Sequence, residues 1–577
     1  MSGGDRYRSR SSSSIDSSSC SGRVGVGRSN ISKSIRINNS SSSIGSSSYI
    51  RRNSRHTSTD SSGKRSSCSN SSSGKRNSSS NSSSIEAGLE VAVAVVVVEV
   101  YAGIVVVEKD VEHDVVVVVE IFSISAVVFF HCEAFMLGTR CQAPCTCSTD
   151  GYTMYIYCNA EGLNTTPHFL KENNHFLQLS VQLYWNHLTT IPNYAFKNLS
   201  ALNATSVEIA VGYNKISTID KYAFYGIENV TTKLELQNNS LTRIPMAVYN
   251  LSALKTLYIQ GNPLNSLGAL SQSEISNTLQ TLKIDLKEFT SWPNELGSLH
   301  TLKSFTVSNL HFTHLDSDAF RGFEHSLTTL DMQYAAKFEK IPTAVCQLSN
   351  LQRLFLRYFT KLNENSTSIF DHCTKKLNKV KVLFMRDSKL TTFPDVFHIF
   401  PSLNIINLGG NSLRIIESAI IPTNNFSSYI NIYLQSNKFT SIPNALNKLK
   451  GLTALDLSYN DISSVEDHDL NGLVHLERLI LSNNPIKYIS THAFRNNNAL
   501  TTLDLRRTSL KSVPAAVVFL PNLSSLDLRT TDPIPCTCEM SYLKGWNATA
   551  VRTFYGQCAY PGVKIQSFVM SSLQQCP

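Results

Sequence analysis

Residues 455–465 read Leu455-Asp-Leu457-Ser-Tyr-Asn460-Asp-Ile462-Ser-Ser-Val465. Residues 234–245 keep the same spacing, as Leu234-Glu-Leu236-Gln-Asn-Asn239-Ser-Leu241-Thr-Arg-Ile244-Pro245. The shared unit is LxLxxN-x-L-x-x-I/L-P, and it recurs about every 24 residues from Leu183 to Leu528. A period of this length predicts a solenoid, which offers a long surface and no cleft of its own.

The LxLxxN core is typical of leucine-rich repeats, in which each unit supplies one short strand that it cannot bury alone. We therefore predict an α/β solenoid, a curved horseshoe with a parallel β-sheet on its concave face. Pro in the return segment, as at Ile341-Pro342 and Ile442-Pro443, predicts irregular or 3₁₀ structure on the convex side. About fifteen repeats span residues 176–531, and the second apolar residues of their strand cores are Leu183, Val211, Leu236, Ile259, Ile284, Val307, Met332, Leu356, Met385, Leu408, Leu434, Leu457, Leu481, Leu505 and Leu528.

An Asn follows most strand cores, where the chain leaves the strand. A buried side-chain amide can bond the backbone of its own turn and of the next turn. This Asn is present at Asn186, Asn214, Asn239, Asn262, Asn411, Asn437, Asn460 and Asn484, and is replaced at Lys287, Leu310, Ala335, Phe359, Ser388, Thr508 and Thr531. Residues 282–390 therefore lack a regular Asn ladder, through either a different local twist or ordinary repeat degeneration.

Eight of the thirteen cysteines flank the repeats. A terminal repeat exposes an apolar edge and needs a polar lid. Lids this short hold their shape through disulfides, which form in an oxidising compartment. The sequence thus predicts Cys-rich caps over residues 141–175 and 532–577. Zinc binding by the Cys-x-Cys clusters is the competing interpretation, and no further Cys or His spacing supports it.

Both flanks resemble known domains. The run Asp532-Pro-Ile-Pro-Cys536-Thr-Cys538-Glu-Met540-Ser-Tyr-Leu543-Lys-Gly-Trp546, with Cys558-Ala-Tyr-Pro561 after it, resembles the C-terminal flank of extracellular leucine-rich repeat proteins such as Slit, the Nogo receptor and Toll-family ectodomains. Asp532 stands where that family has Asn, and the resemblance covers residues 141–577. It implies alternating disulfides, which would be Cys141–Cys147, Cys145–Cys158, Cys536–Cys558 and Cys538–Cys576.

Two further cysteines, Cys346 and Cys373, lie one repeat apart on the outer face. They form either a bridge between neighbouring repeats or two buried free thiols. Sequons for N-glycosylation are compatible with secretion, and they begin at Asn164, Asn198, Asn203, Asn229, Asn238, Asn250, Asn365, Asn425, Asn522 and Asn547.

The first 84 residues are mostly Ser, with 14 Lys and Arg against 3 Asp and Glu. Because residues 1–84 contain so few apolar side chains, their burial could not offset the conformational entropy lost on folding. Residues 1–84 are therefore predicted to be a disordered Ser/Arg-rich tail. Arg-Ser runs such as Arg6-Tyr-Arg8-Ser-Arg10 allow an RNA-binding interpretation, against that of a plain low-complexity tail. Residues 85–140 carry 9 acidic and 2 basic residues, so the net charge of +9 says little about what the repeats bind.

Residues 85–134 hold two Val-rich blocks, Val91–Val107 and Val115–Cys132. Glu120 leaves 12 uncharged residues from Ile121 to Cys132, and a run of about 10–14 is typical of a signal-peptide core. Three interpretations are open. The segment is a signal-anchor with the basic tail inside the cell, or it is an internal signal that is cleaved before Phe135. Alternatively, residues 1–115, which include the tail, are mistranslated repetitive sequence. Against the last, no Met lies between Met1 and Met136. Membrane association is expected only through residues 85–132. No span, lipid-anchor signal or signalling domain follows Cys576, so a receptor would be soluble, N-terminally anchored or a fragment.

Strand residues that flank the inward leucines point to the concave face, and most of them are small or polar. The eighth and ninth repeats differ, because they place two Phe among three Arg, with a Tyr two strands on. Exposed aromatic residues with Arg are typical of interface hot spots. We predict a ligand patch there, made of Arg353, Phe355, Arg357, Phe384, Arg386 and Tyr433. The competing interpretation is a scattered surface, with recognition on the rim, the flanks or the irregular 360–380 segment.

The sequence predicts a non-catalytic extracellular recognition module that binds a protein, glycan or microbial ligand, in adhesion, signalling or innate recognition. The chain would be secreted or on the outer face of the plasma membrane. A structural matrix protein is the alternative. An enzyme is not expected, because HExxH, GxSxG, P-loop and kinase motifs are missing. No cofactor, no metal and no nucleic-acid partner is expected.

Overall fold

The computed structural model describes residues 102–106, 118–122, 143–169, 175–362, 369–370, 372–422, 429–560 and 562–577. The chain divides into two units, residues 1–127 and 128–577. In the first unit, β1 (Ala102–Val106) and β2 (Val118–Phe122) pair antiparallel, with Ile104 opposite Glu120. The predicted tail, residues 1–84, and most of residues 85–134 lie outside the described residues. Within the described part of the chain, no helix is both long and apolar enough to cross a membrane.

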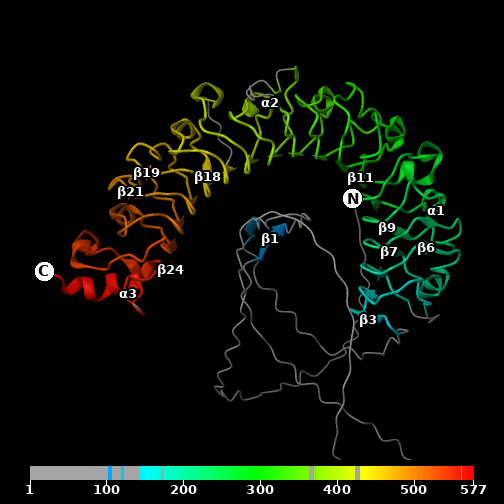
Figure 1. Ribbon diagram of the computed structural model, residues 1–577, viewed down its shortest axis with the longest axis horizontal. Helices are drawn as coiled ribbons and strands as arrows, with labels where there is room; N and C mark the ends of the chain where they lie inside the picture. The colour runs from blue at the N-terminus through cyan, green and yellow to red at the C-terminus, as the bar shows by residue number, and fades with distance from the viewer. Residues whose placement is uncertain are drawn as a thin grey trace, which may run out of the picture. The chain divides into compact units, whose positions relative to one another are not determined.

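The second unit is built on one ladder of strands. Its first pair, β3 with β4, is antiparallel, and each later pair is parallel, as in β4 with β5 and β13 with β14. The strands follow one another along an arc and line its inner side (Figure 1). They are β3 (Thr146–Thr149), β4 (Thr153–Tyr157), β5 (Gln178–Gln182), β7 (Ser206–Ala210), β9 (Thr231–Glu235), β10 (Thr256–Tyr258), β11 (Thr281–Asp285), β12 (Ser304–Ser308), β13 (Thr329–Gln333), β14 (Arg353–Arg357), β15 (Val382–Phe384), β16 (Ile405–Asn407), β17 (Ile430–Tyr433), β18 (Leu452–Asp456), β20 (Arg478–Ile480), β22 (Thr502–Asp504), β23 (Ser525–Asp527) and β24 (Thr553–Tyr555).

Short helical turns return the chain along the outer side, together with two small parallel pairs. Pro residues such as Pro342 and Pro443 stand directly before these turns, where a fixed φ suits the first helical position. The predicted 3₁₀ character of this side is therefore confirmed. The outer elements are β6 (Thr190–Ile191), η1 (Lys197–Leu202), β8 (Thr218–Ile219), α1 (Met246–Tyr249), η2 (Leu270–Gln272), η3 (Glu274–Asn277), η4 (Asn294–Ser298), η5 (Thr343–Gln347), α2 (Val396–Ile399), η7 (Ser418–Ile420), η8 (Asn444–Lys448), β19 (Ser464–Val465), β21 (Tyr488–Ile489) and η9 (Ala515–Phe519).

Each predicted strand core lies on or directly after a strand of the ladder, which confirms the parallel sheet. The inward leucines are fully buried, as at Leu455 and Leu457. Aromatic residues fill the space behind them, and Phe196 stacks on Phe224 of the next repeat with ring centroids 5.7 Å apart. The buried apolar side chains form one continuous core through the repeats. Burial of that core is the main term that stabilises the stack.

The ladder Asn residues connect neighbouring repeats, but in the opposite direction to the one predicted. Asn239 Nδ2 donates to Leu236 O of its own turn at 3.0 Å and to Val211 O of the preceding turn at 3.1 Å. Its Oδ1 accepts from Ile216 N of the preceding turn at 2.9 Å. The Asn side chain therefore bonds the preceding repeat and not the following one, because backbone groups that need a partner lie in the adjacent loop of that preceding repeat.

The caps extend the sheet at both ends. At the N-terminal end, β4 buries Met154 and Ile156 and pairs with β5. At the C-terminal end, β24 pairs with β23, and η10 (Cys538–Leu543), η11 (Ala548–Ala550), α3 (Ile565–Met570) and η12 (Ser572–Gln575) cover the last repeat.

Disulfides hold both caps in the pairs that the resemblance implied: Cys145–Cys158, Cys536–Cys558 and Cys538–Cys576. Cys147 is disulfide-bonded too, and its expected partner Cys141 lies outside the described residues.

Candidate recognition surface

The inner face of the sheet carries rows of side chains that cross the strands in register. One row runs through Asp331, Phe355, Phe384, Asn407 and Tyr433, each opposite the next on neighbouring strands. The leucines between them point the other way and are buried. Strand alternation thus separates a core face from a face available to a partner.

Two Phe residues meet on this face. The rings of Phe355 and Phe384 pack edge to face, with centroids 5.0 Å apart, and both side chains are half-buried. The exposed Arg353 places its guanidinium carbon 5.3 Å from the Phe355 ring centroid. A cation–π contact of this kind contributes about 0.5–1 kcal/mol at an exposed site. Arg353, Phe355 and Phe384 therefore form a preassembled apolar and cationic surface.

The remaining Arg residues of the predicted patch have other partners. Arg357 Nη2 lies 2.6 Å from Asp331 Oδ2, and both side chains are less than 15% exposed (14% and 13%). Gln333 Nε2 also donates to Asp331 Oδ2, at 2.9 Å. Arg386 Nε lies 3.9 Å from Asp387 Oδ2. Arg357 is thus held in an ion pair whose loss would leave a charge unpaired.

Tyr433 is set apart from the Phe pair by one strand. Asn407, fully buried, stands between Phe384 and Tyr433 in the row, and its Oδ1 accepts from Gly409 N at 2.9 Å. We call the six predicted residues, Arg353, Phe355, Arg357, Phe384, Arg386 and Tyr433, the central patch. The structure brings Arg353, Phe355 and Phe384 into contact, and it places Tyr433 at the edge of the central patch.

A second group, which sequence reasoning did not connect, lies nearer the N-terminal cap. Glu235 is bound by Lys233 Nζ at 2.6 Å, by Gln237 Nε2 at 3.0 Å and by a short hydrogen bond from the Tyr184 hydroxyl. Tyr258 lies beside it, with Lys283 Nζ 4.5 Å from the ring centroid. We call Tyr184, Lys233, Glu235, Gln237 and Tyr258 the N-terminal network.

Burial and pairing oppose each other at Glu235. Burial alone would raise the pKa of this carboxyl, but hydrogen bonds from Lys233, Tyr184 and Gln237 bring the pKa below its ordinary value. Burial would lower the pKa of Lys233, and the bond to Glu235 raises that pKa above its ordinary value. Burial, followed by the bond to Glu235, also raises the pKa of Tyr184. The pair is therefore ionised at neutral pH and holds Tyr184 in place.

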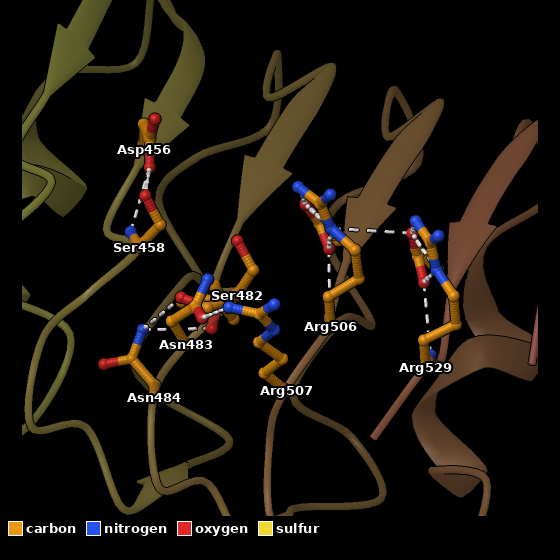
Figure 2. A network of polar contacts seen from close by, with 11 residues as sticks. Asp456, Ser458, Ser482, Asn483, Asn484, Arg506, Arg507 and Arg529 are labelled. Carbon is orange, nitrogen blue, oxygen red and sulfur yellow. Dashed lines mark hydrogen bonds and ion pairs between the residues drawn. The ribbon is translucent and has the colours of Figure 1, made fainter. Parts of the chain in front are cut away.

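A third group occupies the last repeats. Arg506 Nη2 lies 2.8 Å from Asp504 Oδ2, Arg506 Nε lies 3.5 Å from Asp527 Oδ2, and Arg529 Nε donates to Asp527 Oδ1 at 3.0 Å. In Figure 2 the two Arg side chains stand next to each other on neighbouring strands. Asp504, Arg506, Asp527 and Arg529, here the Asp/Arg ladder, are mutually neutralised, so this end of the face is polar without a net charge.

The outer side holds a cavity that the sequence did not reveal. Its volume is about 850 Å³, and it opens between residues 317–325, 344–349 and 375–379. Its lining includes Arg321, Lys375, Lys376 and Lys379, together with Cys346. The Cys346 sulfur is bonded to Cys373, so of the two alternatives the structure has the bridge between repeats. His372 lies beside that bridge, and the disulfide uses the sulfurs that could otherwise bind a metal.

The predicted glycosylation sites lie on the surface wherever the structure describes them. Asn164, Asn198, Asn203, Asn229, Asn238, Asn250, Asn522 and Asn547 are all exposed, whereas Asn365 and Asn425 lie outside the described residues. None of the eight occupies a position in the central patch, so sugars on them would leave its strand positions uncovered.

Comparisons with known proteins agree with this architecture. A family model described as "Leucine rich repeat" matches residues 207–264, 431–486 and 474–532. The chain contains leucine-rich repeats. It is 25% identical over 358 residues to mouse CD180 antigen, covering 61% of this chain and 49% of that one. It is 27% identical over 316 residues to Toll-like receptor 3 of Boselaphus tragocamelus, covering 51% and 35%.

Among solved structures, a chain of the glycosylated Toll–Spatzle complex of Drosophila is similar to this chain. The TM-score is 0.50 at 14% identity, over 67% of this chain and 56% of that one, and it supports the fold alone. The chain spans about half or less of the length of the two receptors named above.

Proposed function

We propose that this leucine-rich repeat protein is a non-catalytic recognition module that binds a protein ligand at the central patch. The contact among Arg353, Phe355 and Phe384 supports this most directly, because the three side chains lie together on the face of the sheet opposite the buried leucines. Aromatic residues and Arg supply most of the binding energy in protein interfaces. The ion pair of Arg357 with Asp331 supports the patch from one side and fixes its shape.

We further propose that the protein works outside the cell or on its outer surface. Disulfides hold both caps and join two central repeats, and such bonds persist in oxidising compartments. The relatives CD180 antigen and Toll-like receptor 3 are consistent with a receptor-like role in recognition. The absence of catalysis, of a cofactor and of a nucleic-acid partner, the domain limits and the use of residues 85–134 as a signal or anchor stay predictions.

Binding to an array of extracellular protein domains tests the proposal. The full chain is compared with Phe384→Ala and Arg353→Glu variants against each domain that binds. We expect each variant to weaken binding by at least about 30-fold, because truncation of a hot-spot residue costs roughly 2 kcal/mol or more. Phe384 and Arg353 are chosen because neither takes part in the buried Arg357–Asp331 pair.

Arg506→Ala is the matched control. Arg506 lies on the same face, and its side chain is 47% exposed, but it belongs to the Asp/Arg ladder. Its loss should leave binding within about twofold, as for a residue outside the hot spot. Equal binding by all the variants would reject the central patch. Self-association of the chain together with binding to matrix fibres would assign it to the structural alternative.

A further inference from the structure

The residue before each ladder Asn has a left-handed backbone. The φ angles of Trp185, Tyr213 and Asn238 are 55°, 57° and 53°, and that of Gly261 in the next repeat is 71°. Gly and Asn adopt this conformation readily, whereas a bulky residue there is an outlier. Such strain costs about 1–3 kcal/mol per residue and persists only where something compensates for it. Tyr459 and Arg507 have the same backbone in later repeats, with φ of 53° and 51°, so the turn itself imposes this conformation. What needs an explanation at Trp185 and Tyr213 is the exposure of two neighbouring rings.

Burial in the core does not supply that explanation. The exposed fractions of Trp185 and Tyr213 are 58% and 43%, so neither side chain is packed in the core. Their ring centroids lie 5.3 Å apart at an interplanar angle of 32°. Tyr184, anchored through its hydroxyl to Glu235, braces both rings from the inner face at 5.6 Å and 6.4 Å. The two rings thus form a fixed aromatic platform on the rim.

A sequon continues the same row. The register pairs Gln182 with Ala210 and Ala210 with Glu235, so the third residue after each, Trp185, Tyr213 and Asn238, stands on consecutive turns. Neighbouring strands lie about 4.8 Å apart. Asn238 begins the sequence Asn238-Asn239-Ser240 and is exposed.

The amide of Asn238 is held over the following repeat. A Cβ atom at Gly261 would lie 2.2 Å from Asn238 Oδ1, so the Gly is what leaves room for this oxygen. With Oδ1 on the side of Gly261, the Nδ2 atom, which carries the sugar in an N-glycan, is left on the other side of the amide. Tyr213 and then Trp185 stand on the two preceding turns, whereas Gly261 stands on the following one.

We propose that Asn238 carries an N-linked glycan whose first sugars stack on Tyr213 and Trp185. In its formation, Nδ2 loses a proton and bonds to the anomeric carbon of a lipid-pyrophosphate-linked oligosaccharide. The bond from that carbon to the pyrophosphate oxygen breaks, and the lipid pyrophosphate leaves with the bonding electrons. The apolar faces of the sugar rings then cover the two aromatic rings, which offsets the exposure of both.

The two rings should hold a covalently attached sugar more readily than a free one. A glycan attached one strand spacing from Tyr213 has a high effective concentration at the rings, so weak stacking suffices to hold it. A free saccharide or a protein partner would have to displace it. The proposal is independent of the central patch, which lies on other repeats.

Two measurements on the chain secreted from glycosylating cells test the proposal. Peptide mapping should find Asn238 occupied. The protein has three tryptophans, of which Trp292 is buried and Trp546 half-buried. Acrylamide quenching of fluorescence, with a Trp185→Phe variant to isolate Trp185, reports on cover over the platform. We expect Asn238→Gln and Ser240→Ala each to raise quenching of Trp185 about twofold, since the indole face loses its cover.

Asn250→Gln is the matched control, because Asn250 begins an exposed sequon at the end of α1 on the outer side. It should leave quenching of Trp185 unchanged. A second readout is the rate at which endoglycosidase removes the Asn238 glycan from the native protein, which should rise several-fold in a Trp185→Ala/Tyr213→Ala double variant. An unoccupied Asn238, or quenching and cleavage rates unchanged in these variants, would overturn the proposal. So would a protein ligand bound by the platform with the glycan in place.

Discussion

At the scale of single residues, a few polar side chains decide whether neighbouring repeats stay joined. Asn239 satisfies two carbonyl groups and one N–H group across two turns, all of them buried. Glu235 collects three donors from three different directions on the inner face. Val211 O also accepts from Asn214 Nδ2 at 3.0 Å, and Leu236 O also accepts from Asn262 Nδ2 at 2.9 Å. Among the described residues, Asn239 is therefore the one side chain that satisfies Ile216 N.

Asn239→Ala should open the stack locally. The variant leaves Ile216 N without its partner, whereas the two carbonyls keep Asn214 and Asn262 as donors. One buried polar group without a partner costs about 1–3 kcal/mol, and we expect a loss of that size around β7 and β9. Hydrogen exchange of the amides in these strands measures it, because repeat arrays do not always unfold in one step. Asn471→Ala, at an exposed position, should change exchange little. Equal exchange in both variants would show that the ladder amide is dispensable.

Glu235→Gln should reduce the loss of folding stability that occurs when the pH is lowered. In the folded chain the pKa of Glu235 lies below its ordinary value. In the unfolded chain the pKa of a Glu side chain is about 4.3. Its ionised form thus stabilises the fold above about pH 4.3, and this contribution is lost as the pH falls through the folded pKa. The melting temperature measured from about pH 6 to pH 3 should fall less in the variant than in the parent. A parallel fall would contradict the role of the carboxylate.

Sequence analysis located the residues of the inner face but not their partners. Strand alternation predicts that Arg357 lies on the inner face, whereas its ion pair with Asp331 depends on side-chain geometry across two repeats. The direction of the Asn ladder was missed for the same kind of reason, since the motif names the amide and not the loop beside it. The N-terminal network needed Tyr184, which lies just outside the strand core.

At the scale of elements, some outer turns of neighbouring repeats pack backbone against backbone. Gly322, with φ of +102°, lies against the carbonyl of Gly297 in the preceding repeat, and a Cβ added there would come within 1.9 Å of that oxygen. No side chain fits without moving backbone. The sequence signals this contact only weakly, because a Gly in a loop has many possible reasons.

Gly322→Ala should therefore destabilise the turn before β13. Overpacking of this kind costs about 1–3 kcal/mol, which thermal denaturation would register as a lower melting temperature. Gly151→Ala is the control, because Gly151 also has positive φ, at +89°, but faces open space. The difference between the two variants isolates the clash from the backbone strain. No difference between them would argue against close stacking of the turns.

The cap strands β4 and β24 extend the sheet beyond the fifteen repeats that the sequence predicts. Alternating apolar residues in Thr153-Met-Tyr-Ile-Tyr157 carry a strand signal that was readable in advance. The three residues of β24, Thr553–Tyr555, carry none, because pairing with β23 rather than local pattern makes them a strand.

Cys538→Ser with Cys576→Ser should loosen the C-terminal cap alone. The bridge closes a loop with a sequence separation of 38 residues, and loss of such a crosslink costs about 2–4 kcal/mol. Limited proteolysis should then cut within residues 532–577 while the central repeats stay intact. Cys346→Ser with Cys373→Ser should instead raise cleavage near η5. Cleavage spread evenly along the chain in either case would contradict separate stabilisation of the caps.

At the scale of the unit from residue 128 to residue 577, one continuous core and one long ladder of strands run through the repeats and both caps. Its period, its strand face and its cap cysteines were predictable because they rest on spacing that the sequence repeats. The cavity beside Cys346 and the rim platform at Trp185 were not, because both arise where repeats depart from the common pattern. The central patch also departs from the common pattern, and recognition is expected there, since a regular surface distinguishes no partner.

Disulfide mapping of the secreted chain tests the central claim most directly, namely that a stack of parallel strands is sealed at both ends by oxidised caps. Peptides released without reduction should be linked as Cys145–Cys158, Cys536–Cys558 and Cys538–Cys576, with Cys346–Cys373 joining two central repeats. Free thiols at these positions, or links between the N-terminal and C-terminal cysteines, would contradict the account.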